Sequence, residues 1–141
     1  MENKVVIALD AMGGDYAPVE TVKGAVEAVN ENKGMKVILV GREEEIKSEL
    51  AKYTYEEASI EIMNATEIID MGEVPTKAIR EKKDSSLVVA IKSVKSGECD
   101  AIVSAGSSGA ILVGGQVIVG RIKGVDRAPL APLIPTEKGV S

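Results

Sequence analysis

Short β-branched runs that alternate with helix-length stretches constrain the fold of this chain more than any other feature. Val5–Leu9 is an apolar run that stops at a turn, and apolar residues then recur at helical spacing through residues 18–30. Further strands are expected at residues 36–40, 59–63 and 101–104, and further helices around residues 46–53, 75–82, 84–94 and 110–119. Strands that alternate with helices imply right-handed crossovers and a mostly parallel sheet covered on both faces.

The last third of the chain carries two more specific expectations. Asp84 is expected to be the N-cap of the helix that carries Leu87 and Ile91. Leu130–Ile134 is expected to begin another strand, after which Pro135–Ser141 forms a turn that leads nowhere. A sheet extended by that strand would lack its next helix, so we expect the 141 residues to be a truncated part of a single longer domain.

Composition excludes several classes of function. The net charge of −5 argues against nucleic acid as a partner, which needs a basic surface. The chain has no His, so an imidazole base or ligand within these residues is excluded. Cys99 is the single cysteine, which leaves no pair for a disulfide or a zinc site and is typical of a packing residue. The longest apolar stretch is shorter than the roughly 20 residues of a membrane span. These features are typical of a reduced, intracellular, soluble domain.

Two glycine-bearing turns follow strands at the edge of the sheet where ligands of α/β proteins bind. The first covers Asp10–Asp15 and contains Gly13 and Gly14; the second covers Ser104–Gly109 and opens a helix. Small residues at such a turn present backbone N–H groups to an anion, and Ser107 and Ser108 add hydroxyl groups. The alternative is a tight strand-to-helix turn that a serine caps.

Three other polar features have open interpretations. Asp10 and Asp15 fit either a general base and a metal ligand or two capping residues. The run Lys82–Ser86 offers cations and hydroxyls to a phosphate, or forms a solvated linker. Residues 120–127 carry three cations that fit a phosphate, an acidic partner or simple surface solvation.

Taken together, these segments resemble the bacterial phosphate acyltransferases of phospholipid synthesis, acyl carrier protein:phosphate acyltransferase. The match consists of residues 7–15, 82–87, 104–110 without positions 107–108, and 120–127, which stand in the family's order and cover nearly the whole chain. Tyr16 stands where the family usually has His, and Ser107–Ser108 stands where it usually has Asn-Thr. Members of this family are about twice as long, so the resemblance identifies these residues as their N-terminal half.

The resemblance implies a three-layer α/β/α sandwich like that of the isocitrate dehydrogenase and phosphotransacetylase group, assembled as a homodimer. It implies transfer of a long-chain acyl group from acyl carrier protein to inorganic phosphate. The acyl phosphate product would pass to a membrane-bound glycerol-3-phosphate acyltransferase. No cofactor and no metal are expected. The implied location is cytoplasmic, with peripheral contact at the membrane.

Phosphate is itself a nucleophile, so the catalyst has to hold it beside the thioester and stabilise the oxyanion. We expect the catalytic residues to be Asp10, Asp15, Lys82, Lys83 and Ser107. We expect phosphate and substrate to contact Gly13, Gly14, Ser85, Ser86, Ser104, Gly106, Ser108, Gly109, Arg121, Lys123 and Arg127.

Three alternatives compete with this interpretation. One keeps the fold but uses a short acyl-CoA as the acyl donor. Another is a truncated fragment that binds phosphate or a partner without turnover. The third, half of a dinucleotide-binding dehydrogenase, is weakened because Gly13-Gly14 lacks a third glycine at the required spacing.

Overall fold

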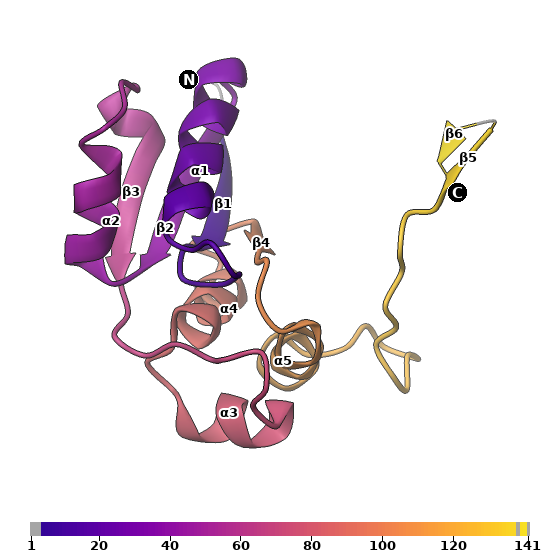
Figure 1. Ribbon diagram of the computed structural model, residues 1–141. Coiled ribbons are helices and arrows are strands. Elements are labelled where there is room, and N and C mark those ends of the chain that lie inside the picture. The colour runs from indigo at the N-terminus through magenta and orange to yellow at the C-terminus, as the bar shows by residue number, and fades with distance from the viewer. Residues whose placement is uncertain (1–3, 138, 141) are drawn as a thin grey trace.

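A parallel sheet of four strands, in the order β3-β2-β1-β4, forms the centre of the molecule (Figure 1). The computed structural model describes residues 4–137 and 139–140. The strands are β1 (Val5–Asp10), β2 (Met35–Gly41), β3 (Ile60–Asn64) and β4 (Ala101–Val103). The predicted α/β class with a parallel sheet is confirmed.

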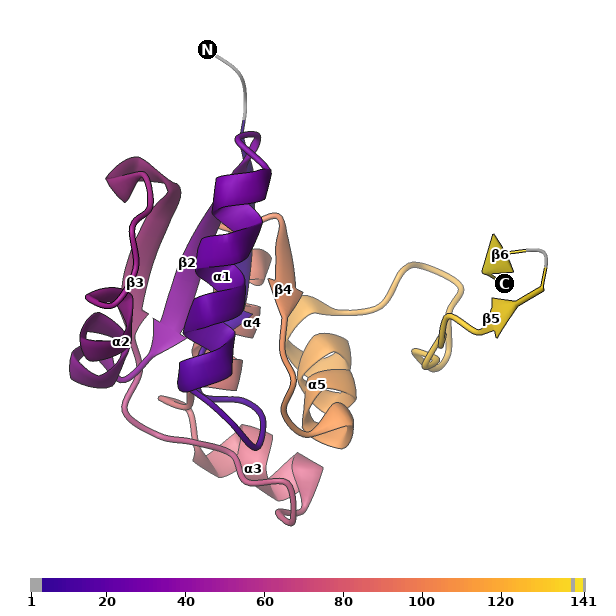
Figure 2. The ribbon, with the colours of Figure 1, turned by 45° about the horizontal axis from the view of Figure 1, so that its top comes forward.

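Helices cover both faces of this sheet. They are α1 (Val19–Glu31), α2 (Glu43–Leu50), the 3-10 turn η1 (Glu57–Ser59), α3 (Pro75–Glu81), α4 (Ser86–Ser96), α5 (Ser108–Gly114) and the π-helical turn η2 (Gly115–Val119). Successive residues of β2 show the two faces, because Val37 and Leu39 pack with α1 and α2 whereas Ile38 and Val40 pack with α4. The result is a three-layer α/β/α arrangement, with α1 and α4 on opposite sides of the sheet in Figure 2.

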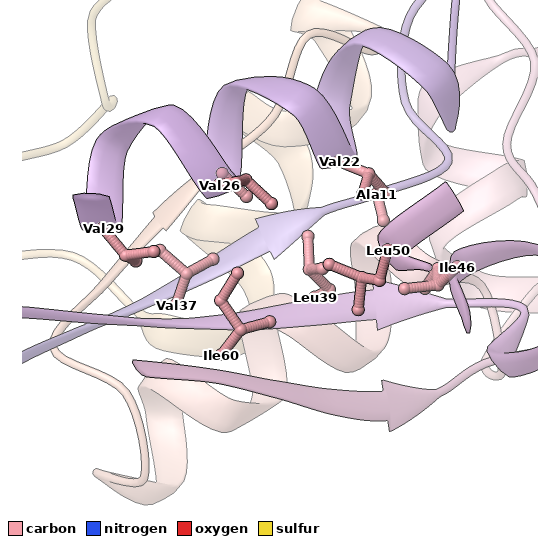
Figure 3. Close-up of a cluster of buried hydrophobic side chains, with 10 residues drawn as sticks. Ala11, Val22, Val26, Val29, Val37, Leu39, Ile46, Leu50 and Ile60 are labelled. Carbon is pink, nitrogen blue, oxygen red and sulfur yellow. The ribbon is translucent and has the colours of Figure 1, made fainter. Parts of the chain in front are cut away.

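Aliphatic side chains build the core on the α1 face. Val22, Val26 and Val29 stand at helical spacing and form one stripe of α1. This stripe lies on Val37 and Leu39 of β2, as Figure 3 shows. The buried residues of this cluster are all aliphatic, and Tyr53 and Tyr55 pack against its margin.

A second apolar cluster joins α3, α4 and α5 beside the sheet. Ile79 of α3 and Ile91 of α4 are buried in it, together with Ala110 of α5. Gly114 allows this close packing, because a Cβ atom there would overlap Ile91 Cδ1 and lie 3.2 Å from Ile79 Cδ1. The three helices therefore form one packed unit.

Two local expectations are wrong. Ser85, and not Asp84, is the N-cap of α4; Asp84 instead accepts hydrogen bonds from the backbone and side chain of Thr66. Residues 130–134 form no strand, because Pro132 within the segment lacks a donor for a strand ladder and Pro129 and Pro135 flank it. The chain there forms only a two-residue pairing of β5 (Pro135–Thr136) with β6 (Gly139–Val140). Residues 138 and 141 of the predicted terminal turn lie outside the described residues.

The side on which successive strands are added to the sheet changes at β1. The chain moves from β1 through β2 to β3, then crosses by α3 and α4 to β4 on the other side of β1. Leu9 of β1 is in register with Val103 of β4, so both strands end at the same level. The two glycine-bearing turns consequently lie side by side at the carboxyl edge of the sheet, where ligands bind in open α/β sheets.

Candidate functional site

The buried carboxylate of Asp10 connects three distant segments at this edge. Its Oδ1 accepts a hydrogen bond of 2.6 Å from Ser86 Oγ, and its Oδ2 accepts one of 2.8 Å from Ser104 Oγ. The backbone N–H of Met12 also donates to Oδ1, at 3.3 Å. We refer to Asp10, Ser86 and Ser104 as the Asp10 cluster. It links the end of β1, the first turn of α4 and the turn after β4.

Burial determines what this carboxylate can do. Asp10 is only 3% exposed, so hydroxyl and amide donors take the place of water as partners of its carboxylate oxygens. The hydroxyl protons of Ser86 and Ser104 point to Asp10 and are therefore not available to a ligand. This geometry favours a role in which Asp10 organises the two turns.

Two glycines let the turns approach each other. A Cβ atom at Gly13 would overlap Asp10 Oδ2 and lie 2.9 Å from Ser104 Oγ. A Cβ atom at Gly106 would lie 3.2 Å from Ser104 Oγ and 3.5 Å from Gly13 Cα. Gly14 has a φ of +113°, which favours glycine. The first turn is thus shaped by glycine at both positions.

The predicted residues of the two turns are therefore brought together. Ser107 is buried and caps α5, where its Oγ accepts a hydrogen bond of 3.3 Å from Ala110 N. That bond uses a lone pair, so the Ser107 hydroxyl keeps its proton for another acceptor. Ser108 and Asp15 are exposed at the same edge.

Ser85 and Gly109, two other predicted binding residues, have structural roles. Ser85 is buried, and its Oγ accepts a hydrogen bond of 3.3 Å from Val88 N as the cap of α4. Gly109 makes room for α3, because a Cβ atom there would lie 2.8 Å from Pro75 Cγ.

In the part of the chain that the structure describes, the lysines predicted for catalysis form no hydrogen bond or ion pair with the Asp10 cluster. Lys82 Nζ forms an ion pair with Glu73 and donates a hydrogen bond of 2.6 Å to the carbonyl oxygen of Ile68. The hydrogen bond from Lys82 lowers the pKa of Glu73. Lys83 is exposed and lines a hollow between α3, α4 and η2. Lys82 therefore fixes the loop before α3 in this structure.

The cations of residues 121–127 lie on an extended segment that leaves the sheet after η2 (Figure 1). Arg121 donates to the carbonyl oxygen of Asp126, which closes a small loop. Lys123 and Arg127 are exposed on this segment. The structure does not bring these three cations to the Asp10 cluster.

Sequence reasoning missed two residues that shape the site. Thr21 Oγ1 donates a hydrogen bond of 2.7 Å to the carbonyl oxygen of Ala11 and so holds the first turn against α1. Glu73 forms an ion pair with Lys82. A threonine in the first turn of a helix is a weak signal for the contact between Thr21 and Ala11. The periodicity of the sequence gives no signal for the ion pair between Glu73 and Lys82.

Metal-ligand groups and membrane-spanning helices are both absent from residues 4–137 and 139–140. Within them, no group of three or more His, Cys, Asp or Glu side chains is arranged to hold a metal ion. No helix there has the length and apolar character needed to cross a bilayer.

Comparisons with known proteins agree with the resemblance stated above. The sequence model of the family described as "Fatty acid synthesis protein" matches residues 5–141. A "Phosphate acyltransferase" of Clostridium botulinum (strain Loch Maree / Type A3) is 50% identical over 134 residues, which is 95% of this chain and 40% of the relative. Proteins of the same name from Dictyoglomus turgidum and Alkaliphilus oremlandii are 54% and 53% identical and cover 92% and 96% of this chain. The chain spans about 40% of the length of the curated relatives it matches.

Proposed function

The chain belongs to the fatty acid synthesis protein family, and from this premise we propose that it acts in the transfer of an acyl group to inorganic phosphate. The phosphate is held between the two glycine-bearing turns, at the carboxyl ends of β1 and β4. The observation that carries this proposal is the Asp10 cluster, which joins both turns to the start of α4.

The acyl donor is a long-chain acyl thioester of acyl carrier protein. A phosphate oxygen attacks the thioester carbonyl carbon, the carbon–sulfur bond breaks, and the carrier leaves as a thiolate that takes up a proton. The product is an acyl phosphate. This reaction requires a held nucleophile and donors for the oxyanion, and no activated side chain.

The chemistry of the turns supports this assignment. The exposed Ser108 hydroxyl and the Ser107 hydroxyl can both donate to an anion. Gly13 and Gly14 allow a ligand to approach the backbone closely. Asp10 positions the turns from beneath, because its carboxylate is buried and already satisfied.

The remaining predicted residues have less direct roles. Asp15 forms the exposed wall of the first turn. Lys82 positions the loop before α3 through Glu73. Arg121, Lys123 and Arg127 stay predictions for contacts with phosphate or with the acidic carrier protein.

Further proposals follow from the family resemblance. The working protein is a homodimer in the cytoplasm, peripheral to the membrane, and passes its product to a membrane-bound glycerol-3-phosphate acyltransferase. The alternative donor, a short acyl-CoA, is distinguished by comparing acyl chains of different length. The alternative function, binding of phosphate without turnover, is distinguished by the assay below.

The test is phosphate-dependent release of free carrier thiol from long-chain acyl carrier protein. The double variant Ser107→Ala/Ser108→Ala should raise the KM for phosphate by at least about tenfold, since each hydrogen bond to a charged group contributes about 1.5–3 kcal/mol and about 1.4 kcal/mol corresponds to tenfold. Ser48→Ala, which changes an exposed serine on α2, is the matched control and should leave that KM unchanged. An unchanged KM in the double variant contradicts the assigned phosphate site. A folded chain that binds phosphate and gives no turnover supports the non-catalytic alternative.

A further inference from the structure

A groove on the far side of the molecule from α1 combines an apolar floor with a cationic edge. It lies between α3, α4 and the α5–η2 segment and has a volume of about 520 Å³. The same three helices lie together in both Figure 1 and Figure 2. None of the described residues that line it is acidic, although acidic residues outnumber basic ones in the chain, 22 to 17. We refer to this feature as the cationic groove.

The apolar part of the cationic groove is built from packed helices and is accessible. Ile79 and Val88 form its buried floor, and Val117 on η2 is 70% exposed at its side. Lys95 Nζ donates a hydrogen bond of 2.9 Å to the carbonyl oxygen of Val119 and so ties η2 to α4. Gly114 keeps α5 close to α4. The groove is therefore formed without any rearrangement.

The cations lie on the α3 and α4 sides of the groove. Arg80 lies near the C-terminal end of α3, and Lys83 lies just after that helix. Lys92 lies one turn after Val88 on α4. Arg80 has only a 3.8 Å ion pair with its neighbour Glu81. Within the part of the chain that the structure describes, Lys83 and Lys92 have no ion-pair partner. Lys92 also helps to lower the pKa of Asp84, whereas the positive charge of Lys83 is left to attract an acidic ligand.

We propose that the cationic groove is the docking site for an acidic amphipathic helix of a partner protein. The apolar face of that helix lies against Val113, Val117 and Ile118, and its acidic flank faces Lys83 and Lys92. This is the usual way in which a helix binds in a groove: apolar positions one turn apart fill the floor and charges at the rim select the partner.

The shape and the charge of the groove favour a helix over a small amphiphilic anion. Small-molecule sites bury most of the surface of their ligand. This groove is open to solvent, with its cations on the α3 and α4 sides and the apolar Val113, Val117 and Ile118 on the α5–η2 side. A helix with distinct acidic and apolar faces matches that division.

The inference rests on the proposed function in one respect: acyl carrier protein, an acidic protein, serves as the probe. The dissociation constant of the chain for acyl carrier protein is measured without phosphate by calorimetry or NMR, at low and high ionic strength. We expect Lys83→Glu/Lys92→Glu to weaken binding by roughly tenfold at low salt and to abolish most of its salt dependence. Val117→Asp should weaken it similarly, because the exposed valine contributes to the apolar side and not to folding.

Matched controls separate docking from general charge and folding effects. Lys23→Glu/Lys33→Glu makes the same change of charge at exposed positions in α1 and just after it, and Leu133→Asp changes an apolar side chain that is 81% exposed outside the groove. Both should leave binding unchanged, and circular dichroism confirms that every variant is folded. Unchanged binding in both groove variants overturns the proposal, as does a wild-type chain that does not bind the carrier.

Two outcomes distinguish this inference from the proposed function. Binding that the groove variants weaken, in a chain that releases no acyl group, supports the docking site and contradicts the reaction. Turnover with an unchanged KM for the carrier in the groove variants supports the reaction and overturns the docking site. Groove variants that abolish self-association and leave carrier binding intact identify a second copy as the occupant, which also overturns the proposal.

Discussion

Ser86 Oγ donates a hydrogen bond of 2.6 Å to Asp10 Oδ1, although 76 positions separate the two residues in the sequence. Asp10 ends β1, and Ser86 is the first residue of α4, which crosses the opposite face of the sheet. The bond fixes the start of that helix against the turn that follows β1. Together with Ser104 on the turn after β4, it makes the candidate site a product of three segments.

Asp10→Asn should destabilise the chain by about 1–3 kcal/mol, because an amide nitrogen would replace an oxygen that accepts from a serine hydroxyl. The free energy of unfolding in urea, followed by circular dichroism, measures this loss. Asp100 provides the comparison, since its exposed Oδ2 accepts a hydrogen bond of 2.8 Å from Val6 N. Asp100→Asn should cost less than about 1 kcal/mol. Equal losses in the two variants would contradict the special role of Asp10.

Gly13→Ala should destabilise the chain and weaken phosphate binding, because the added Cβ would overlap Asp10 Oδ2. The buried carboxylate cannot move away without breaking its hydrogen bonds. Gly24→Ala is the control, as nothing lies within 4 Å of a Cβ at that position on α1. This second change should stabilise the chain by about 0.5–1 kcal/mol through helix propensity. A neutral Gly13→Ala variant would show that the turn is looser than described.

The acid sensitivity of the fold should depend on Asp84. Hydrogen bonds from the side chain and backbone of Thr66 lower the pKa of Asp84 from its ordinary value of 3.8. Between the lowered folded pKa and 3.8 the unfolded chain binds the proton and the folded chain does not, so the stability that Asp84 contributes is lost as pH falls through this range. Urea midpoints between neutral pH and pH 3 should therefore fall less steeply in Asp84→Asn than in the wild type. The same slope in both would count against this account.

Cys99 should react slowly with thiol reagents. Burial raises the pKa of its thiol, so the thiolate fraction is small at mildly alkaline pH and access is limited. We expect the folded chain to react with an aromatic disulfide reagent at least about tenfold more slowly than the chain unfolded in urea. Similar rates in the two states would show that this side chain is accessible in the folded protein.

Local sequence patterns predicted the elements of this fold well. The β-branched runs and the helical spacing of Val22, Val26 and Val29 are local signals, and the structure confirms the strands and helices that they indicate. The strand at residues 130–134 failed, since its apolar composition concealed the effect of three prolines. The cap of α4 was misplaced by one residue, because Asp84 and Ser85 are both good caps and Thr66 engages Asp84.

The candidate site was only partly predictable. The rule that ligands bind at the carboxyl ends of strands pointed to both glycine-bearing turns, and the structure places them together. The position of β4 beside β1 depends on long-range packing that periodicity does not encode. For the same reason the ion pair between Lys82 and Glu73 could not be derived from the local charge pattern.

The most direct test of the account is an NMR titration of the ¹⁵N-labelled chain with inorganic phosphate. We predict that the largest amide shifts occur in residues 12–15 and 105–109, and that Ser107→Ala/Ser108→Ala reduces them. Shifts that are confined to residues 120–127, or the absence of any saturable shift in the folded chain, would contradict the placement of phosphate between β1 and β4.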